Sequence, residues 1–232
     1  MTSSASLRDR AIRFIQLMTG DEKHDASAAS TLDVLVVLYD GILRISPSTL
    51  HDPGRDRFLL SKGHGPMAYY AVLAATGFID PAVLPSFGDY DSILGRHPDR
   101  TLVPGVELSS GSLGHGLPIA VGLAHGLAAD PAGSDGARVF CLVGDAELDE
   151  GSNHEAIALA GRLGLDRLRA IVIDNRSSTH GWPGGIAARF EVEGWSSRTV
   201  DGRDHDALRD AFLAARPGRP HVVVAVIDEE PA

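Results

Sequence analysis

The sequence predicts an α/β fold over residues 1–232, a single domain with an open, mostly parallel sheet flanked by helices. Two short apolar runs, at 138–143 and 169–173, have the length of buried strands. Between these runs, four apolar residues fall on one face of a helix, namely Ala156, Ile157, Ala160 and Leu163. A strand, a helix and a second strand in this order form a βαβ unit, whose strands run parallel.

The first third of the chain is helical by the same criterion. Apolar residues recur at helical spacing over 12–18 and again over 32–43, which predicts two amphipathic helices. Thr31 is the expected N-cap of the second helix. That helix should end before Pro47, because the residue before a proline resists helical angles.

The remaining elements extend this pattern on both sides of the βαβ unit. Residues 61–66 predict a turn and 67–75 a helix, while the weakly polar run 117–129 predicts a buried helix. In the last third, strands are expected at 197–200 and 221–227. A helical stretch at 206–215 separates these two strands, and Ser152 or Asn153 is the expected cap of the helix in the βαβ unit.

Composition and charge exclude several classes of protein. Hydrophobic residues make up 44% of the chain and charged residues 22%, which is ordinary globular usage and excludes a disordered or fibrous protein. The formal net charge of −10 argues against broad attraction to nucleic acid or to an anionic membrane. Small molecules or other proteins are therefore the expected partners.

The N-terminal segment carries Arg8, Arg10 and Arg13 within its apolar part, which a signal peptide does not tolerate. The longest weakly polar run is too short for the roughly 20 residues that a membrane helix needs. We therefore expect a cytoplasmic protein without a membrane partner. The single cysteine, Cys141, excludes an intrachain disulfide, and its apolar neighbours indicate a buried strand.

Polar residues follow both strands of the predicted βαβ unit. Asp145 comes directly after the first strand, and Asn175 follows the second one 30 positions later. The carboxyl ends of parallel strands meet at one edge of the sheet, where ligands bind in open α/β folds. A carboxylate and an amide oxygen suit a hard cation such as Mg²⁺, which takes its other ligands from water and phosphates. Gly144 allows close backbone approach, although Gly-Asp and Asp-Asn pairs are also ordinary turn residues.

The residues around these positions resemble a known family. Gly-Asp-Ala-Glu-Leu-Asp-Glu-Gly at 144–151, followed by Asp174-Asn175, resembles the signature of thiamine diphosphate-binding proteins. Further segments resemble landmarks of the transketolase family in their usual order, and these are 61–65, 95–98, 104–107 and 111–116. Together they span roughly residues 24 to 205.

The resemblance implies a role for each matching residue. Asp145, Asn175 and the backbone carbonyl of Ser177 would bind Mg²⁺ or Ca²⁺ together with two diphosphate oxygens. The cofactor contacts that it implies are His64, Gly111, Leu113, Gly144, Ala146, Asn175 and His180. The catalytic residues that it implies are His24, His64, His97 and Glu150. The amide of Ala146 would face the diphosphate, and Glu150 would lie at a subunit interface.

Four departures from the family pattern accompany this resemblance. Ala146 replaces the second glycine of the signature, and the glycines usual after the histidine at His24 are absent. The chain also ends before the stretch that normally supplies another cofactor-side histidine, for which His180 is the substitute. The largest departure is the absence of a region that resembles the pyrimidine-binding domain.

The resemblance therefore implies a split enzyme, in which a separate pyrimidine-binding (C-terminal transketolase) subunit contributes the glutamate that activates the cofactor. We expect a heterotetramer of the two subunits. The expected reaction is transfer of a two-carbon ketol unit from a sugar phosphate, a ketose donor, to an aldose. Two alternatives stay open, which are transfer to a lipoyl or carrier-protein thiol and a non-catalytic orphan half. A phosphohydrolase is disfavoured, because Asp145 is followed by Ala146-Glu147 and not by a closely spaced second aspartate to serve as the acid.

Overall fold

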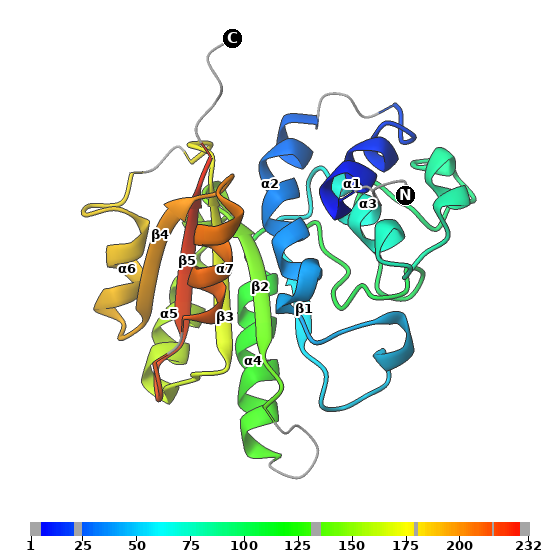
Figure 1. Ribbon diagram of the computed structural model, residues 1–232. Helices are drawn as coiled ribbons and strands as arrows, with labels where there is room; N and C mark the ends of the chain where they lie inside the picture. Colours follow the sequence, from blue (N-terminus) through cyan, green and yellow to red (C-terminus); the bar gives the residue numbers. More distant parts are fainter. Residues whose placement is uncertain (1–5, 21–24, 131–135, 179–180, 215, 228–232) are drawn as a thin grey trace.

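A computed structural model describes residues 6–20, 25–130, 136–178, 181–214 and 216–227 of the chain. Its centre is one open sheet in which every pair of neighbouring strands is parallel, in the order β1-β2-β3-β5-β4 (Figure 1). The strands are β1 Arg57–Leu60, β2 Val139–Gly144, β3 Leu168–Asp174, β4 Ser196–Asp201 and β5 His221–Val226. The α/β class and the parallel βαβ unit predicted from the sequence are confirmed.

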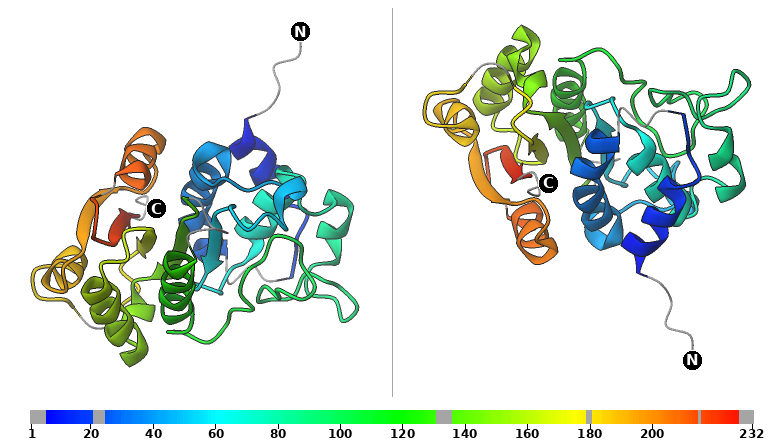
Figure 2. Two further views of the ribbon diagram at one scale, coloured as in Figure 1. Left: turned by 90° about the horizontal axis from the view of Figure 1, so that it is seen from below. Right: turned by 90° about the horizontal axis from the view of Figure 1, so that it is seen from above.

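Helices cover both faces of the sheet, as the views along its edge show (Figure 2). One face packs against α4 Gly116–Ala129, α5 Gly151–Leu163 and α6 Ile186–Val192, and the other against α2 Asp25–Val37 and α7 His205–Leu213. Two further helices, α1 Leu7–Ile15 and α3 Met67–Ala75, pack beside α2. Shorter helical segments are Leu38–Ile42, Pro47–Thr49, Pro81–Ser86 and Ala146–Asp149.

Strand β2 shows how the sequence builds this two-faced core. Its side chains alternate between the faces, so that Phe140 and Leu142 join the cluster under α2 and α7. Cys141 and Val143 join the cluster under α4 and α5. All four side chains are fully buried, which explains why the strand reads as a continuous apolar run.

Several details differ from the sequence-based predictions. Thr31 is not an N-cap but lies inside α2, where its hydroxyl donates to the carbonyls of Ser27 and Ala28. Ser152 and Asn153 do not cap α5, because their side chains donate to the carbonyls of Gly114 and Glu147 instead. Strand β1 and helix α6 were not predicted, since four and seven residues are too short to establish a periodic pattern.

Helix α4 is only half buried, which corrects the predicted buried helix. Ile119 and Leu123 are exposed, and nothing lies within 4 Å of a Cβ built on Gly122 or Gly126. Leu163 of α5 is likewise exposed, although its spacing predicted a place on the buried face. Within the described residues, no helix has the length and apolar character that crossing a membrane requires.

Asp56 precedes β1 and holds it to neighbouring segments through hydrogen bonds and ion pairs. Its buried carboxylate accepts hydrogen bonds from the backbone N–H of Arg44 and of Arg138, each at 2.9 Å, and pairs with both guanidinium groups. Burial by itself would raise the pKa of this carboxyl, but the hydrogen bonds and charges of Arg138 and Arg44 prevail and lower the pKa.

We expect Asp56→Ala to reduce the free energy of unfolding by about 2 kcal/mol at neutral pH, because buried donors lose a charged acceptor. A carboxyl with a lowered pKa contributes stability above its ordinary value, 3.8, and this contribution is lost as pH falls through the lowered value. Urea unfolding as a function of pH measures both effects. Asp52→Ala, at an exposed position nearby, is the matched control. Equal stability of the two variants would contradict this role of Asp56.

Candidate functional site

The loops that follow β2 and β3 meet through the carboxylate of Asp145. This residue is buried, with 1% of its surface exposed, and its Oδ1 accepts hydrogen bonds from the Ser177 hydroxyl and from the Ala146 N–H at 2.8 Å. Its Oδ2 accepts from the Ser178 N–H at 3.1 Å. The predicted proximity of these two strand ends is therefore present. The Ala146 N–H donates to Asp145, whereas the sequence resemblance directed it towards a diphosphate.

The side chain of Asn175 indicates that this site binds a ligand. Its side-chain Oδ1 is buried and, among the described residues, has no hydrogen-bond partner. A buried acceptor without a partner costs free energy unless a ligand or an ion completes it. The neighbouring Arg176 has a φ of 57°, a left-handed conformation that turns the chain sharply at the end of β3.

An oxygen set of this kind fits a hard divalent cation. Asp145 and Asn175 come from adjacent strands and offer a carboxylate and an amide oxygen. The described residues contain no cluster of three or more His, Cys, Asp or Glu side chains that could hold an ion alone. Mg²⁺ commonly takes one or two carboxylates and completes its shell with phosphate oxygens and water. The residues present thus suit a cation that is bound together with a phosphate.

Glu147 connects three loops at this edge of the sheet, and the sequence-based reasoning gave it no role. Its Oε1 accepts hydrogen bonds from the Ser61 hydroxyl and from the Gly114 N–H at 3.0 Å, and its Oε2 accepts from the Gly144 N–H at 3.3 Å. Glu147 is 1% exposed, and burial raises the pKa of its carboxyl. Its position inside the 144–151 signature was the only sequence signal.

Lys62 is a second residue that the sequence-based reasoning left without a role. Its ammonium group donates to the hydroxyl and, at 3.1 Å, to the carbonyl of Ser27. Its Cδ would lie 3.5 Å from a Cβ built on Gly144, so the side chain passes directly beside the signature. Burial lowers the pKa of Lys62 to about 8, and this shift is opposed by the charges of Asp145 and Glu147. A cation so placed can offset the charge of a bound phosphate.

Because a bound anion favours the protonated amine, we expect affinity for a diphosphate-bearing ligand to fall as pH rises through about 8. Lys62→Met should weaken binding about tenfold below that pH and flatten the dependence above it. Titration calorimetry of both proteins over this pH range is the measurement. Arg203→Met, at an exposed residue beyond β4, controls for the loss of one positive charge. A pH profile that is identical in the two proteins would contradict this assignment.

The histidine-bearing turns pack against one another, as the order of the landmarks predicted. The rings of His64 and His97 meet edge to face with centroids 5.4 Å apart. A Cβ built on Gly111 would lie 3.1 Å from His97 Cδ2, and one on Gly63 would lie 2.9 Å from the Gly111 backbone N. Both histidines are exposed, so their rings are accessible from outside this chain.

Glu150 and Leu113 lie on the outer side of the same edge. A Cβ built on Gly114 would lie 2.7 Å from Glu150 Cβ, which places the start of α5 against the glycine-rich loop. Glu150 and Leu113 are both exposed. The structure therefore brings together the predicted site residues from 61 to 177, whereas His24 and His180 lie outside the described residues.

Comparison with known proteins agrees with this geometry. Residues 6–227 match the family model described as transketolase, thiamine diphosphate binding domain. The chain belongs to the transketolase family. Its fold matches the solved transketolases of Leishmania mexicana, with a TM-score of 0.78 and 26% identity, and of Campylobacter jejuni, with 0.79 and 27%. Each match covers 97% of this chain, and 37% and 38% of those proteins, so it spans little more than a third of their length.

Curated relatives include shorter members of the transketolase family. One subunit of the apulose-4-phosphate transketolase of Actinobacillus succinogenes is 39% identical over 87% of this chain and 75% of that subunit. A protein of Rhodococcoides fascians named ferredoxin fas2 is 53% identical over 94% of this chain and 71% of that protein. The predicted family resemblance and the predicted cofactor, thiamine diphosphate, are confirmed for this domain.

Proposed function

We propose that this chain supplies the metal- and diphosphate-binding half of the active site of a split transketolase. The observation that carries the proposal is the buried Oδ1 of Asn175, which has no hydrogen-bond partner among the described residues and belongs to the loop whose Ser177 and Ser178 donate to the carboxylate of Asp145. Asp145, Asn175 and the Ser177 carbonyl would hold Mg²⁺ or Ca²⁺ against two diphosphate oxygens. Lys62 would offset the remaining charge of the diphosphate.

Bound thiamine diphosphate supplies the electron sink that stabilises a two-carbon fragment, and the chain's own residues bind and orient it. Glu147 holds the loops of Ser61, Gly114 and Gly144 in place around the cofactor's diphosphate end. His64 and His97, exposed and adjacent, would donate hydrogen bonds or move protons at sugar oxygens, since imidazole does either near neutral pH.

The substrate class in this proposal is a ketose phosphate that donates a two-carbon ketol unit to an aldose. Two observations support it over transfer to a carrier thiol. One relative is named as a subunit of an apulose-4-phosphate transketolase, and another, of Clostridium, is named 6-deoxy-6-sulfo-D-fructose transketolase subunit SqwG. Both names describe enzymes that act on sugars bearing an anionic group.

A separate pyrimidine-binding subunit would complete the site and form a heterotetramer with this chain. Three relatives are named as one of the subunits of a transketolase, which supports a partner. The outward faces of the neighbouring helices α4 and α5 also expose apolar side chains that an interface would bury. These side chains are Ile119, Leu123, Leu159 and Leu163. Glu150 is exposed at the start of α5, where a partner could reach it.

Calorimetric titration of thiamine diphosphate tests the proposal, with and without Mg²⁺ and with and without the copurifying partner. We expect metal-dependent binding that becomes tighter in the complex. The complex should then transfer two carbons from a ketose phosphate to an aldose. Absence of binding at millimolar cofactor in both preparations would refute the site. Binding without transfer from any ketose phosphate would refute the reaction while leaving the site in place.

A further inference from the structure

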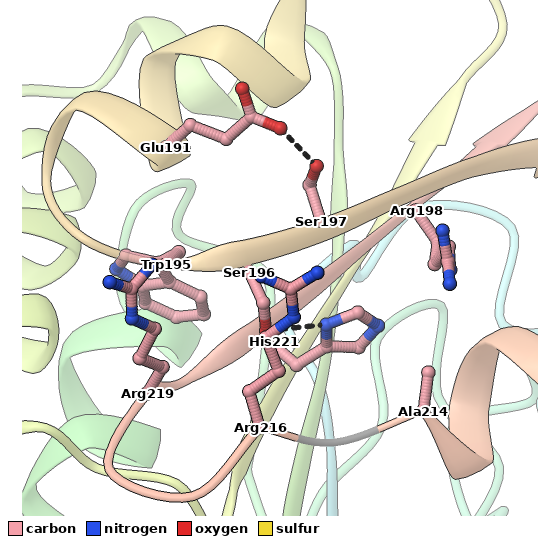
Figure 3. Close-up of a pocket in the computed structure, with 9 residues that line it drawn as sticks. All are labelled: Glu191, Trp195, Ser196, Ser197, Arg198, Ala214, Arg216, Arg219 and His221. Atoms are coloured by element: carbon pink, nitrogen blue, oxygen red, sulfur yellow. Dashed lines mark hydrogen bonds between the residues drawn. The ribbon is translucent and has the colours of Figure 1, made fainter.

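A cavity lies beside the amino ends of β4 and β5. Asp145, in contrast, follows the carboxyl end of β2, so the cavity and the candidate site lie at opposite ends of the parallel strands. The volume of the cavity is about 380 Å³, within the range of small-molecule pockets. Three arginines line it, with Arg198 on β4 and Arg216 and Arg219 on the segment before β5 (Figure 3). The transketolase-like site described above uses none of these residues.

The three arginines have no charged partner within the part of the chain that the structure describes. All are exposed, and within the described residues no guanidinium group of the three forms an ion pair or a side-chain hydrogen bond. The chain as a whole carries a formal charge of −10, whereas three arginines and one carboxylate, Glu191, line this cavity, so its local charge is positive. Such a concentration of positive charge attracts a small anion.

The turn that presents two of these arginines is fixed by its sequence. Arg216-Pro217-Gly218-Arg219 has proline at the second position and, at the third, a glycine with a φ of 71°, which is typical of a type II turn. The Arg219 N–H donates to the Arg216 carbonyl at 3.1 Å. The Gly218 N–H donates to Asp166 Oδ2 at 3.0 Å, which ties the turn to the loop before β3. The two guanidinium groups are thus carried on a preorganised backbone.

Ser196 and His221 form the floor of the cavity, at paired positions of β4 and β5. His221 Nε2 donates to the Ala211 carbonyl at 3.2 Å, and the Ser196 hydroxyl contacts both His221 Nδ1, at 2.9 Å, and the Pro220 carbonyl, at 3.2 Å. Burial, together with the charges of Arg169 and Arg198, lowers the pKa of His221 to about 4. The imidazole is therefore neutral near pH 7, and the positive charge of the cavity comes from the arginines.

We propose that this cavity binds the phosphate group of a small phosphorylated metabolite. Planar guanidinium groups bind phosphate oxygens through paired hydrogen bonds, and more than one can share a phosphate. Glu191 lines the same cavity and accepts a hydrogen bond from the Ser197 hydroxyl (Figure 3). A carboxylate at that place repels a free anion but accepts hydrogen bonds from the hydroxyl groups of an ester. The cavity therefore favours a phosphate ester of a polyol over inorganic phosphate.

Titration of the full chain with glycerol 3-phosphate, at fixed ionic strength, tests the proposal. This ester is not a ketose and so does not resemble a transketolase donor. We expect saturable binding at millimolar concentration or below, with weaker binding of inorganic phosphate and no binding of glycerol. Arg216→Gln combined with Arg219→Gln should weaken binding at least about tenfold, because two charged donors are lost. Should the double variant fail to fold, Arg198→Gln tests the same cavity from β4.

Two controls separate this cavity from general charge and from the cofactor site. Arg203→Gln removes one exposed charge beyond the far end of β4 and should leave affinity unchanged. Asp145→Asn disturbs the proposed cofactor site and should also leave it unchanged. Absence of saturable binding, equal affinity for inorganic phosphate, or equal losses in Arg203→Gln would overturn the proposal. Loss of binding in Asp145→Asn would place the phosphate at the other edge and would overturn it as well.

Discussion

Asp145→Ala is expected to abolish Mg²⁺-dependent binding of thiamine diphosphate, lowering affinity by more than about a hundredfold. In the proposed site this carboxylate is the only charged protein ligand of the cation. It also accepts hydrogen bonds from the loops after both β2 and β3, through Ala146, Ser177 and Ser178. Removing it therefore removes a ligand and also releases the loop that carries Asn175.

Asp145→Asn separates these two effects. The amide keeps one acceptor oxygen and the shape of the side chain, so the loops should stay closer to their native positions while the charge is lost. Calorimetric titration with and without Mg²⁺ measures affinity, and urea unfolding measures stability. Asp201→Asn, at the carboxyl end of β4, is the matched control. Native affinity in both Asp145 variants would refute the proposed metal site.

Glu147→Ala is expected to have the largest effect on stability, a loss of about 4 kcal/mol. Three donors from separate loops, on Ser61, Gly114 and Gly144, would lose their buried acceptor at once. Glu147→Gln should cost about half as much, because its single carbonyl oxygen satisfies part of the set. Both changes should weaken cofactor binding, since the loops around the diphosphate end would no longer be held together.

The pH dependence of stability distinguishes this positioning role from simple packing. Because burial raises the pKa of Glu147, the folded protein holds this proton to higher pH than the unfolded chain does. Stability therefore decreases as pH rises from the ordinary value, 4.5, through the raised one. Glu147→Gln cannot titrate and should lose this component of the pH dependence. Urea unfolding at several pH values is the measurement, and an unchanged pH dependence in Glu147→Gln would contradict the role.

The sequence was sufficient for the parts of the fold that depend on local pattern. The apolar runs of β2 and β3 and the helical face between them predict a βαβ unit, and topology then places Asp145 near Asn175. One of the two edge strands was harder to predict, whereas the other, β4, was expected at 197–200 and spans Ser196–Asp201. Strand β1 has four residues and begins with Arg57, so neither length nor alternation identifies it. Helix α4 shows the opposite error, because an apolar composition does not reveal which face meets the sheet.

The part of the site that sequence could not give depends on contacts between distant segments. Glu147 accepts hydrogen bonds from residues 86 and 33 positions away, and no local pattern encodes such a meeting. Lys62 has a lowered pKa only because the fold buries it. The family resemblance, in contrast, assigned His64, His97 and Gly111 to one place, and the structure brings their turns together.

The single cysteine of this chain can be used to measure how often the sheet opens. Cys141 lies in the middle of β2, bonded to strands on both sides and 0% exposed, and burial raises its pKa well above the ordinary range. A disulfide reagent can therefore react with it only after the sheet opens. Its labelling rate, measured on the unmodified protein with no competing cysteine, reports how often the two cofactor-binding loops lose their common support.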